Sequence, residues 1–184
     1  MKIKKSFNEY KNSINSILSN ITDKQLDKSI NIIDQIAKRK GKVYIVGNGG
    51  SASIASHVSV DFAKIARIKS STFNNSNLIT CFANDYGYEN WVTEAIKAYS
   101  SNKDMFILIS SSGNSKNIVN AAKFCKKKSI NCITLSGFKK NNPLSKLGKV
   151  NFHIESNQYN FIEMSHHIIL VYLVDIFAKN KLKK

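Results

Sequence analysis

Four serines and an asparagine stand together in segment 110–115, which reads Ser-Ser-Ser-Gly-Asn-Ser. The segment follows the apolar run Met105–Ile109 and precedes a helix-like pattern, so its hydroxyls would converge on a helix N-terminus. Neutral donors of this kind suit a phosphate monoester that must bind and leave reversibly. The alternative is a serine-rich turn that caps a helix, but one cap uses only one hydroxyl. We therefore predict a phosphate site formed by Ser110, Ser111, Ser112, Asn114 and Ser115.

A second loop, Gly47-Asn48-Gly49-Gly50-Ser51-Ala52, directly follows the apolar run Val43–Val46. Its glycines let backbone N–H groups approach an anion, and a helix N-terminus adds about half a positive charge. Read as G-x-G-x-x-A, the loop also matches a dinucleotide fingerprint, which needs an acidic residue about 20 positions later. Segment 67–72 contains no acid, so we expect no nucleotide cofactor. We predict that Asn48, Gly49, Gly50 and Ser51 join the phosphate site.

Two further segments carry groups that could transfer protons. His57 and Asp61 lie four apart on a predicted helix, so they could act as an acid–base pair or as two metal ligands. The alternative is an ordinary surface pair worth a few tenths of a kcal/mol. Asp85 follows an apolar run and is either a substrate ligand or a helix cap.

The start of the last predicted helix holds three more candidates. Glu163 precedes His166 by three residues and His167 by four, so either pair could share a face. In isolation, a carboxylate in this place more often interacts with the helix dipole than with a substrate.

Short apolar runs that alternate with helical patterns position these residues. Because the runs are continuously apolar, they are typical of parallel strands covered on both faces, and they predict an α/β fold with a doubly wound five-stranded sheet. The expected strands are Val43–Val46, Leu78–Phe82, Met105–Ile109, Asn131–Leu135 and Val150–Ile154, with helices at 51–66, 89–100, 115–128 and 143–148.

The chain of 184 residues is the length of one domain. Residues 1–41 are expected to form an N-terminal helical arm and 42–184 the α/β core. The helix expected at 160–180 is apolar on almost every side, which predicts burial on all sides and contacts between subunits.

The composition excludes several classes of protein. The basic N-terminus leads into no apolar h-region, and no apolar run approaches the ~20 residues of a membrane span. Three cysteines in apolar contexts are typical of reduced thiols, so we expect a cytoplasmic protein without a membrane partner. The net charge of +16 would suit a nucleic-acid binder. Since nearly all the cations are lysines and their runs stand where helices should end, we interpret them as solvated surface and expect no nucleic-acid partner.

Together, the two loops, the His57–Asp61 pair and the segment Asn84–Tyr88 resemble the phosphoheptose isomerases of the sugar isomerase (SIS) domain family. The resemblance covers nearly the whole chain. It implies a homotetramer with active sites shared between subunits. It also implies the isomerisation of sedoheptulose 7-phosphate to an aldoheptose 7-phosphate for lipopolysaccharide or capsule synthesis. In the family the serine loop holds the phosphate, assisted here by Ser51.

The chain departs from the family pattern in the catalytic and zinc-binding residues that the resemblance implies. The family has Glu where this chain has Asp61, Gln where it has Ile162 and His where it has Val171. Half of the expected zinc site is therefore absent, which leaves His57 and Asp61 as its only matched ligands. His167 could substitute only if the helix were rotated.

These departures leave two functions open. The first is a phosphosugar isomerase with Asp61 as base and His57 as acid, working through an enediol(ate). The second is a catalytically weak or inactive member of the fold that binds phosphosugars or a partner protein.

Overall fold

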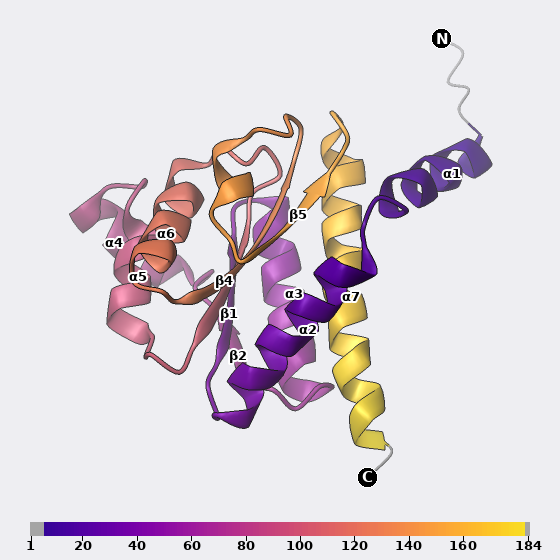
Figure 1. Cartoon of the computed structure of the whole chain (residues 1–184). Helices are drawn as coiled ribbons and strands as arrows, with labels where there is room; N and C mark the ends of the chain where they lie inside the picture. Colours follow the sequence, from indigo (N-terminus) through magenta and orange to yellow (C-terminus); the bar gives the residue numbers. More distant parts are fainter. Residues whose placement is uncertain (1–5, 183–184) are drawn as a thin grey trace.

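A parallel sheet with strand order β2-β1-β3-β4-β5 forms the centre of the fold (Figure 1). The computed structural model describes residues 6–182, so Met1–Lys5 of the basic N-terminus and the last two residues lie outside it. The strands are β1 (Val43–Gly47), β2 (Ser70–Thr72), β3 (Met105–Ile109), β4 (Asn131–Gly137) and β5 (Val150–Ile154). All the pairings are parallel, which confirms the predicted fold class.

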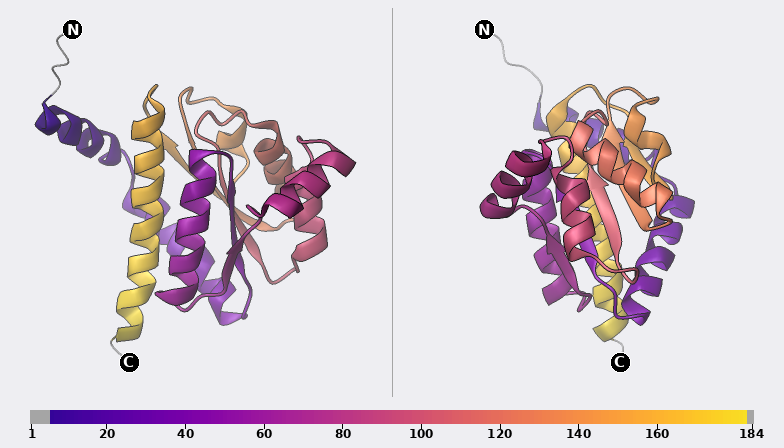
Figure 2. Two further views of the ribbon diagram at one scale, coloured as in Figure 1. Left: turned by 180° about the vertical axis from the view of Figure 1, so that it is seen from behind. Right: turned by 90° about the vertical axis from the view of Figure 1, so that its left-hand side faces the viewer.

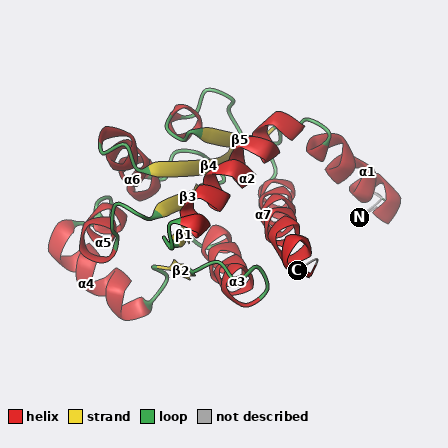
Figure 3. Ribbon diagram, turned by 60° about the horizontal axis from the view of Figure 1, so that its bottom comes forward, coloured by secondary structure: helices red, strands yellow, loops and turns green. Residues whose placement is uncertain are grey.

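Helices cover both faces of this sheet, as Figures 2 and 3 show from different sides. One apolar core lies between the sheet and α2 (Asp23–Lys38), α3 (Gly50–Lys64) and α7 (Tyr159–Leu182). A second core lies beneath α5 (Trp91–Tyr99), α6 (Lys116–Lys127) and the short 3-10 helix η1 (Pro143–Lys146). With both faces covered, every residue of β1 and β3 is buried, which explains their continuously apolar sequences.

The strand predicted at Leu78–Phe82 is wrong, because this run lies inside helix α4 (Ser76–Tyr86). The Asn75 side chain caps that helix by accepting hydrogen bonds from the backbone N–H groups of Asn77 and Leu78. Leu78 and Phe82 are four residues apart, so both reach the second core from one helix face. The edge strand is instead Ser70–Thr72, which is only partly buried and therefore carries no apolar signature.

Helix α7 is less buried than its sequence predicts. Met164, Ile168 and Tyr172 repeat every four residues on one face and are 43%, 46% and 42% exposed. Within the described residues, only the span Tyr159–Lys179 of α7 is long and apolar enough to cross a membrane. Half of that span is buried inside the domain, as expected for a core helix with one uncovered face.

The remaining helix, α1 (Phe7–Leu18), starts with a capping box between Ser6 and Glu9. It lies on the far side of α7 from the sheet (Figure 1), and its Tyr10 ring lies 4.8 Å from the ring of Phe161 in the first turn of α7. None of its residues is buried within this chain.

Candidate functional site

A cavity of about 270 Å³ opens where β1 and β3 end. The sheet register pairs Gly47 with Ile109, so the glycine loop and the serine loop begin side by side. Eight of the ten residues predicted for substrate and phosphate binding line this cavity. The complete lining is Asn48, Gly49, Gly50, Ser51, Ile109, Ser110, Ser111, Ser112, Ser115, Tyr159 and Glu163.

The serine hydroxyls form a buried network beside the cavity. Ser110 Oγ donates to Ser115 Oγ over 3.0 Å, and the hydroxyl oxygens of Ser51 and Ser111 lie 3.4 Å apart. Ser51, Ser110 and Ser111 are at most 6% exposed. Hydroxyls can rotate to donate or accept, so this network can turn its hydrogens towards an anion.

Two of the helices that begin at the cavity, α3 and α6, have no side-chain cap. Gly49, at φ 54°, precedes α3, and Ser115 precedes α6, yet neither end has a capping hydrogen bond from a side chain. By contrast, α1, α2 and α4 all have such caps. The serines are therefore not used as caps, and the first N–H groups of both helices stay available for an anion.

Glu163 supplies the carboxylate of the cavity wall, and no other carboxylate and no Lys, Arg or His lines the cavity within the described residues. Its Oε1 accepts from Ser111 Oγ over 3.4 Å. A Cβ at Gly50 would overlap the Glu163 carboxylate, so the glycine leaves room for that side chain beside the cavity. Ile162 points the other way, into the core next to Gly137.

His57, Asp61 and His167 form a separate polar cluster farther along α3 and α7. His57 Nε2 lies 3.0 Å from Asp61 Oδ2, and the His57 and His167 rings are 5.0 Å apart. His167 Nε2 is buried without a hydrogen-bond partner. Burial, and to a lesser degree the neighbouring His57, lowers the pKa of His167, while Asp61 opposes this shift. The tertiary structure thus brings His167 next to the predicted His57–Asp61 pair. None of these three residues lines the cavity at the two loops.

Three predicted residues lie elsewhere. Asp85 is exposed on α4, where it accepts from its neighbour Asn84 over 3.0 Å. Asn114 holds the serine turn by donating to the Ser112 carbonyl over 2.9 Å. His166 is completely buried beside the Ser136 carbonyl, and burial lowers its pKa to about 4. His166 therefore belongs to the core as a neutral imidazole.

Tyr159 and the apolar Ile109 are the cavity residues that the sequence analysis did not place in the site, and Tyr159 is the polar one. It lies at the first position of α7, and its ring packs edge-on against Phe138 with 4.8 Å between centroids. No spacing pattern singles out Tyr159, because its role depends on where α7 begins relative to the serine loop.

The donor set does not complete a zinc site. Within residues 6–182, no three His, Cys, Asp or Glu side chains are arranged to hold a metal ion. Ile162 and Val171 pack against the apolar core and have no donor atoms. His57 and Asp61, with the unpartnered His167 Nε2 nearby, are the groups from which such a site would have to be built.

Comparisons with known proteins show the family and the fold to which this chain is similar. Residues 9–137 match the model of the SIS domain family. The chain is 43% identical over 108 residues to phosphoheptose isomerase 2 of Campylobacter jejuni, an alignment that spans 54% of this chain and 53% of that protein. It is 30% identical to the phosphoheptose isomerase of Aneurinibacillus thermoaerophilus, with 92% of both chains aligned. The solved phosphoheptose isomerase of Francisella tularensis superimposes with a TM-score of 0.82 at 21% identity, over 94% of this chain and 96% of that one.

Proposed function

Because this chain belongs to the phosphoheptose isomerases of the SIS domain family, we propose that it interconverts sedoheptulose 7-phosphate and an aldoheptose 7-phosphate. The observation that carries the proposal is the cavity between the two uncapped helix N-termini, with its buried serine network. Such a site holds a phosphate through hydroxyls and backbone N–H groups without a permanent cation.

In this proposal the phosphate binds in the cavity at the two loops, and the sugar extends from there along α3 towards His57. The reacting carbons C1 and C2 lie at the opposite end of the sugar from the phosphate, so the groups that act on them need not line the phosphate cavity. His57 is seven residues beyond Gly50 on α3, which at ~1.5 Å per residue corresponds to about 10 Å. The His57–Asp61 pair is therefore suitably placed for chemistry at that end.

Asp61 is the proposed base and His57 the proposed acid. Asp61 removes the proton from the carbon next to the carbonyl, and the electron pair moves onto the carbonyl oxygen to give an enediol(ate). His57 Nε2, 3.0 Å from Asp61, protonates or stabilises that oxygen. His57 then takes the proton of the C1 hydroxyl as the C1 carbonyl forms, and Asp61 returns its proton to C2, which gives the aldose and restores both groups.

Zinc is what the family resemblance implies, but its full ligand set is not present in this chain. Ile162 and Val171 cannot bind a metal, and no three donors converge within the described residues. We therefore assign the proton transfers to Asp61 and His57 alone.

The Glu163 carboxylate lies where a dianionic phosphate would bind, so Glu163→Gln is expected to tighten phosphosugar binding by about tenfold. The physical reason is relief of a repulsion of roughly 1–4 kcal/mol between unit charges near 4 Å. Calorimetric titration with sedoheptulose 7-phosphate and inorganic phosphate measures the effect. Glu94→Gln, which removes a carboxylate paired with Lys97 on α5, serves as the control with unchanged affinity. Weaker binding by Glu163→Gln would mean that Glu163 accepts hydrogen bonds from the sugar instead.

We also propose that the protein is a homotetramer and that the exposed face of α7 lies between subunits. Met164, Ile168 and Tyr172 form an apolar stripe there, beside a groove of about 370 Å³. Ile168→Asp is expected to reduce the mass measured by light scattering to that of a smaller species, because a charge would be buried against apolar side chains. Tyr99→Asp alters an exposed aromatic residue on α5, on the other face of the sheet, and should leave the mass unchanged. A monomeric wild-type protein would contradict this proposal.

We also propose a cytoplasmic location and a role in lipopolysaccharide or capsule synthesis, which the family resemblance implies. The free thiols of Cys81, Cys125 and Cys132 are compatible with a reducing compartment.

The function is tested by incubating the purified protein with sedoheptulose 7-phosphate in D₂O, with and without added zinc. We expect an aldoheptose 7-phosphate that carries deuterium at C2, because an enediol(ate) exchanges its proton with solvent. Unphosphorylated sedoheptulose is the control and should react far more slowly. Tight binding without turnover in either condition would instead support a phosphosugar-binding protein.

A further inference from the structure

The carboxamides of Asn48 and Asn117 form a closed pair at the edge of the cavity. Asn48 Nδ2 donates to Asn117 Oδ1 over 3.0 Å, and Asn117 Nδ2 donates back to Asn48 Oδ1 over 2.9 Å. Asn48 lies in the glycine loop and lines the cavity, whereas Asn117 lies in the first turn of α6 and does not. Two parallel hydrogen bonds between planar groups fix the plane of the Asn48 amide, which one bond would leave free to turn.

The burial of Asn117 indicates what its amide is for. The residue is only 1% exposed, and Asn48 both accepts one of its Nδ2 hydrogens and donates to its Oδ1. A buried amide contributes little net stability compared with an apolar residue of similar shape, so an amide here is best explained by the geometry that it imposes.

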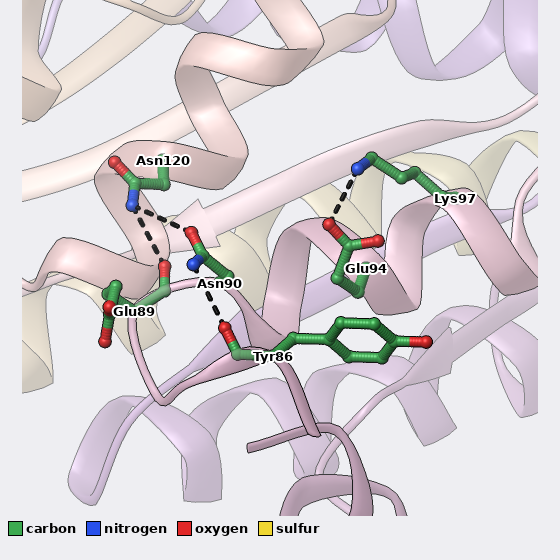
Figure 4. A network of polar contacts seen from close by, with 6 residues as sticks. All are labelled: Tyr86, Glu89, Asn90, Glu94, Lys97 and Asn120. Atoms are coloured by element: carbon green, nitrogen blue, oxygen red, sulfur yellow. Dashed lines mark hydrogen bonds and ion pairs between the residues drawn. The ribbon is translucent and has the colours of Figure 1, made fainter. Parts of the chain in front are cut away.

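A third contact comes from the segment between α4 and α5. The Tyr88 hydroxyl donates to Asn48 Oδ1 over 3.4 Å. Figure 4 shows how α6 holds this segment: Asn120, three residues after Asn117, donates to the Glu89 carbonyl over 3.0 Å, and Asn90 donates to the Tyr86 carbonyl over 3.0 Å. Helix α6 thus fixes both the glycine loop and the segment that carries Tyr88.

We propose that Asn117 is a positioning residue for phosphosugar binding, which acts only by orienting Asn48. In this arrangement Asn48 Oδ1 receives two donors, and one of the two Nδ2 hydrogens is used by Asn117. The second hydrogen is available for an oxygen atom of the phosphate or of a sugar hydroxyl in the cavity. The inference rests on the proposed function for the identity of the sugar but not for the presence of an anion site.

A double-mutant cycle tests this dependence. Calorimetric titration measures the affinities for sedoheptulose 7-phosphate and for inorganic phosphate in four full-length proteins. These are the wild type, Asn48→Ala, Asn117→Ala and the double variant. We expect each single change to weaken binding of sedoheptulose 7-phosphate by about tenfold, and the double variant to match Asn48→Ala within twofold. A further tenfold loss when Asn117→Ala is added to Asn48→Ala would overturn the proposal.

Melting temperatures separate positioning from folding. Asn48→Ala leaves the buried Asn117 amide without its partner, so the double variant should melt above Asn48→Ala. Asn151→Ala removes another hydrogen-bonded amide, one that donates to Thr134 Oγ1 in the sheet, and should lower the melting temperature without changing the affinity. An equal loss of affinity in Asn151→Ala would show that general destabilisation explains the result. The affinities for inorganic phosphate could show the expected pattern in the four proteins while the wild type does not turn over sedoheptulose 7-phosphate. That result would contradict the proposed function and leave this inference intact.

Discussion

Asp61→Asn is expected to lower turnover of sedoheptulose 7-phosphate by about 10²–10⁴, the usual effect of removing a general base. An amide has the size and shape of the carboxylate and can still contact His57 Nε2, now 3.0 Å from Asp61 Oδ2, but it cannot accept the substrate proton. Binding should be retained, because Asp61 does not line the phosphate cavity. The measurement is therefore kcat together with the calorimetric affinity for the same sugar.

Asp34→Asn provides a matched control for this prediction. Asp34 forms a pair of the same i,i+4 spacing with Lys38 on α2, at 2.7 Å, and has no place in the site. Its kcat should equal that of the wild type. Normal turnover by Asp61→Asn would remove Asp61 as the base and leave Glu163 as the carboxylate nearest to the sugar.

Ser111→Ala is expected to weaken phosphosugar binding by about 10–100-fold. The buried Ser111 hydroxyl lies between Ser51 and Glu163, and a hydrogen bond to a charged group contributes about 1.5–3 kcal/mol. The same loss should appear with inorganic phosphate, because this hydroxyl is assigned to the phosphate rather than to the sugar. Titration with both ligands measures the two effects.

The control for the serine loop is Ser59→Ala on α3. Ser59 is 5% exposed, and its hydroxyl donates to the Ser56 carbonyl. Ser59→Ala therefore measures the effect of removing a buried, hydrogen-bonded hydroxyl that does not line the cavity. It should leave both affinities unchanged. An unaltered affinity in Ser111→Ala would show that the backbone N–H groups hold the phosphate without this hydroxyl.

Glu163 and Asp61 divide the site into two parts with different electrostatics. The cavity at the loops is lined by neutral donors and one carboxylate, whereas the His57–Asp61–His167 cluster pairs imidazoles with an acid. The first part suits reversible binding of a phosphate and the second suits proton transfer. Helices α3 and α7 carry residues of both parts. The packing of these two helices therefore sets the distance between the cavity at the loops and the His57–Asp61–His167 cluster.

The sequence by itself determined four of the five strands, the meeting of the two loops at one edge of the sheet and the His57–Asp61 pair. Strands covered on both faces can be predicted from their apolar runs, because every residue of β1 and β3 is buried. The loops after two neighbouring parallel strands must meet at one edge, so their serines and glycines could be placed together without coordinates.

Only the tertiary structure decided which residues of the last helix face the site. Neighbouring positions on a helix differ by about 100°, and α7 is apolar on nearly every side, so no polar face marks its orientation. Packing against α3 turns Glu163 to the cavity and His167 to His57, while Ile162 and His166 enter the core. The same competition between local pattern and packing made Leu78–Phe82 a helix, because its capped start and its contacts with α5 favour that form.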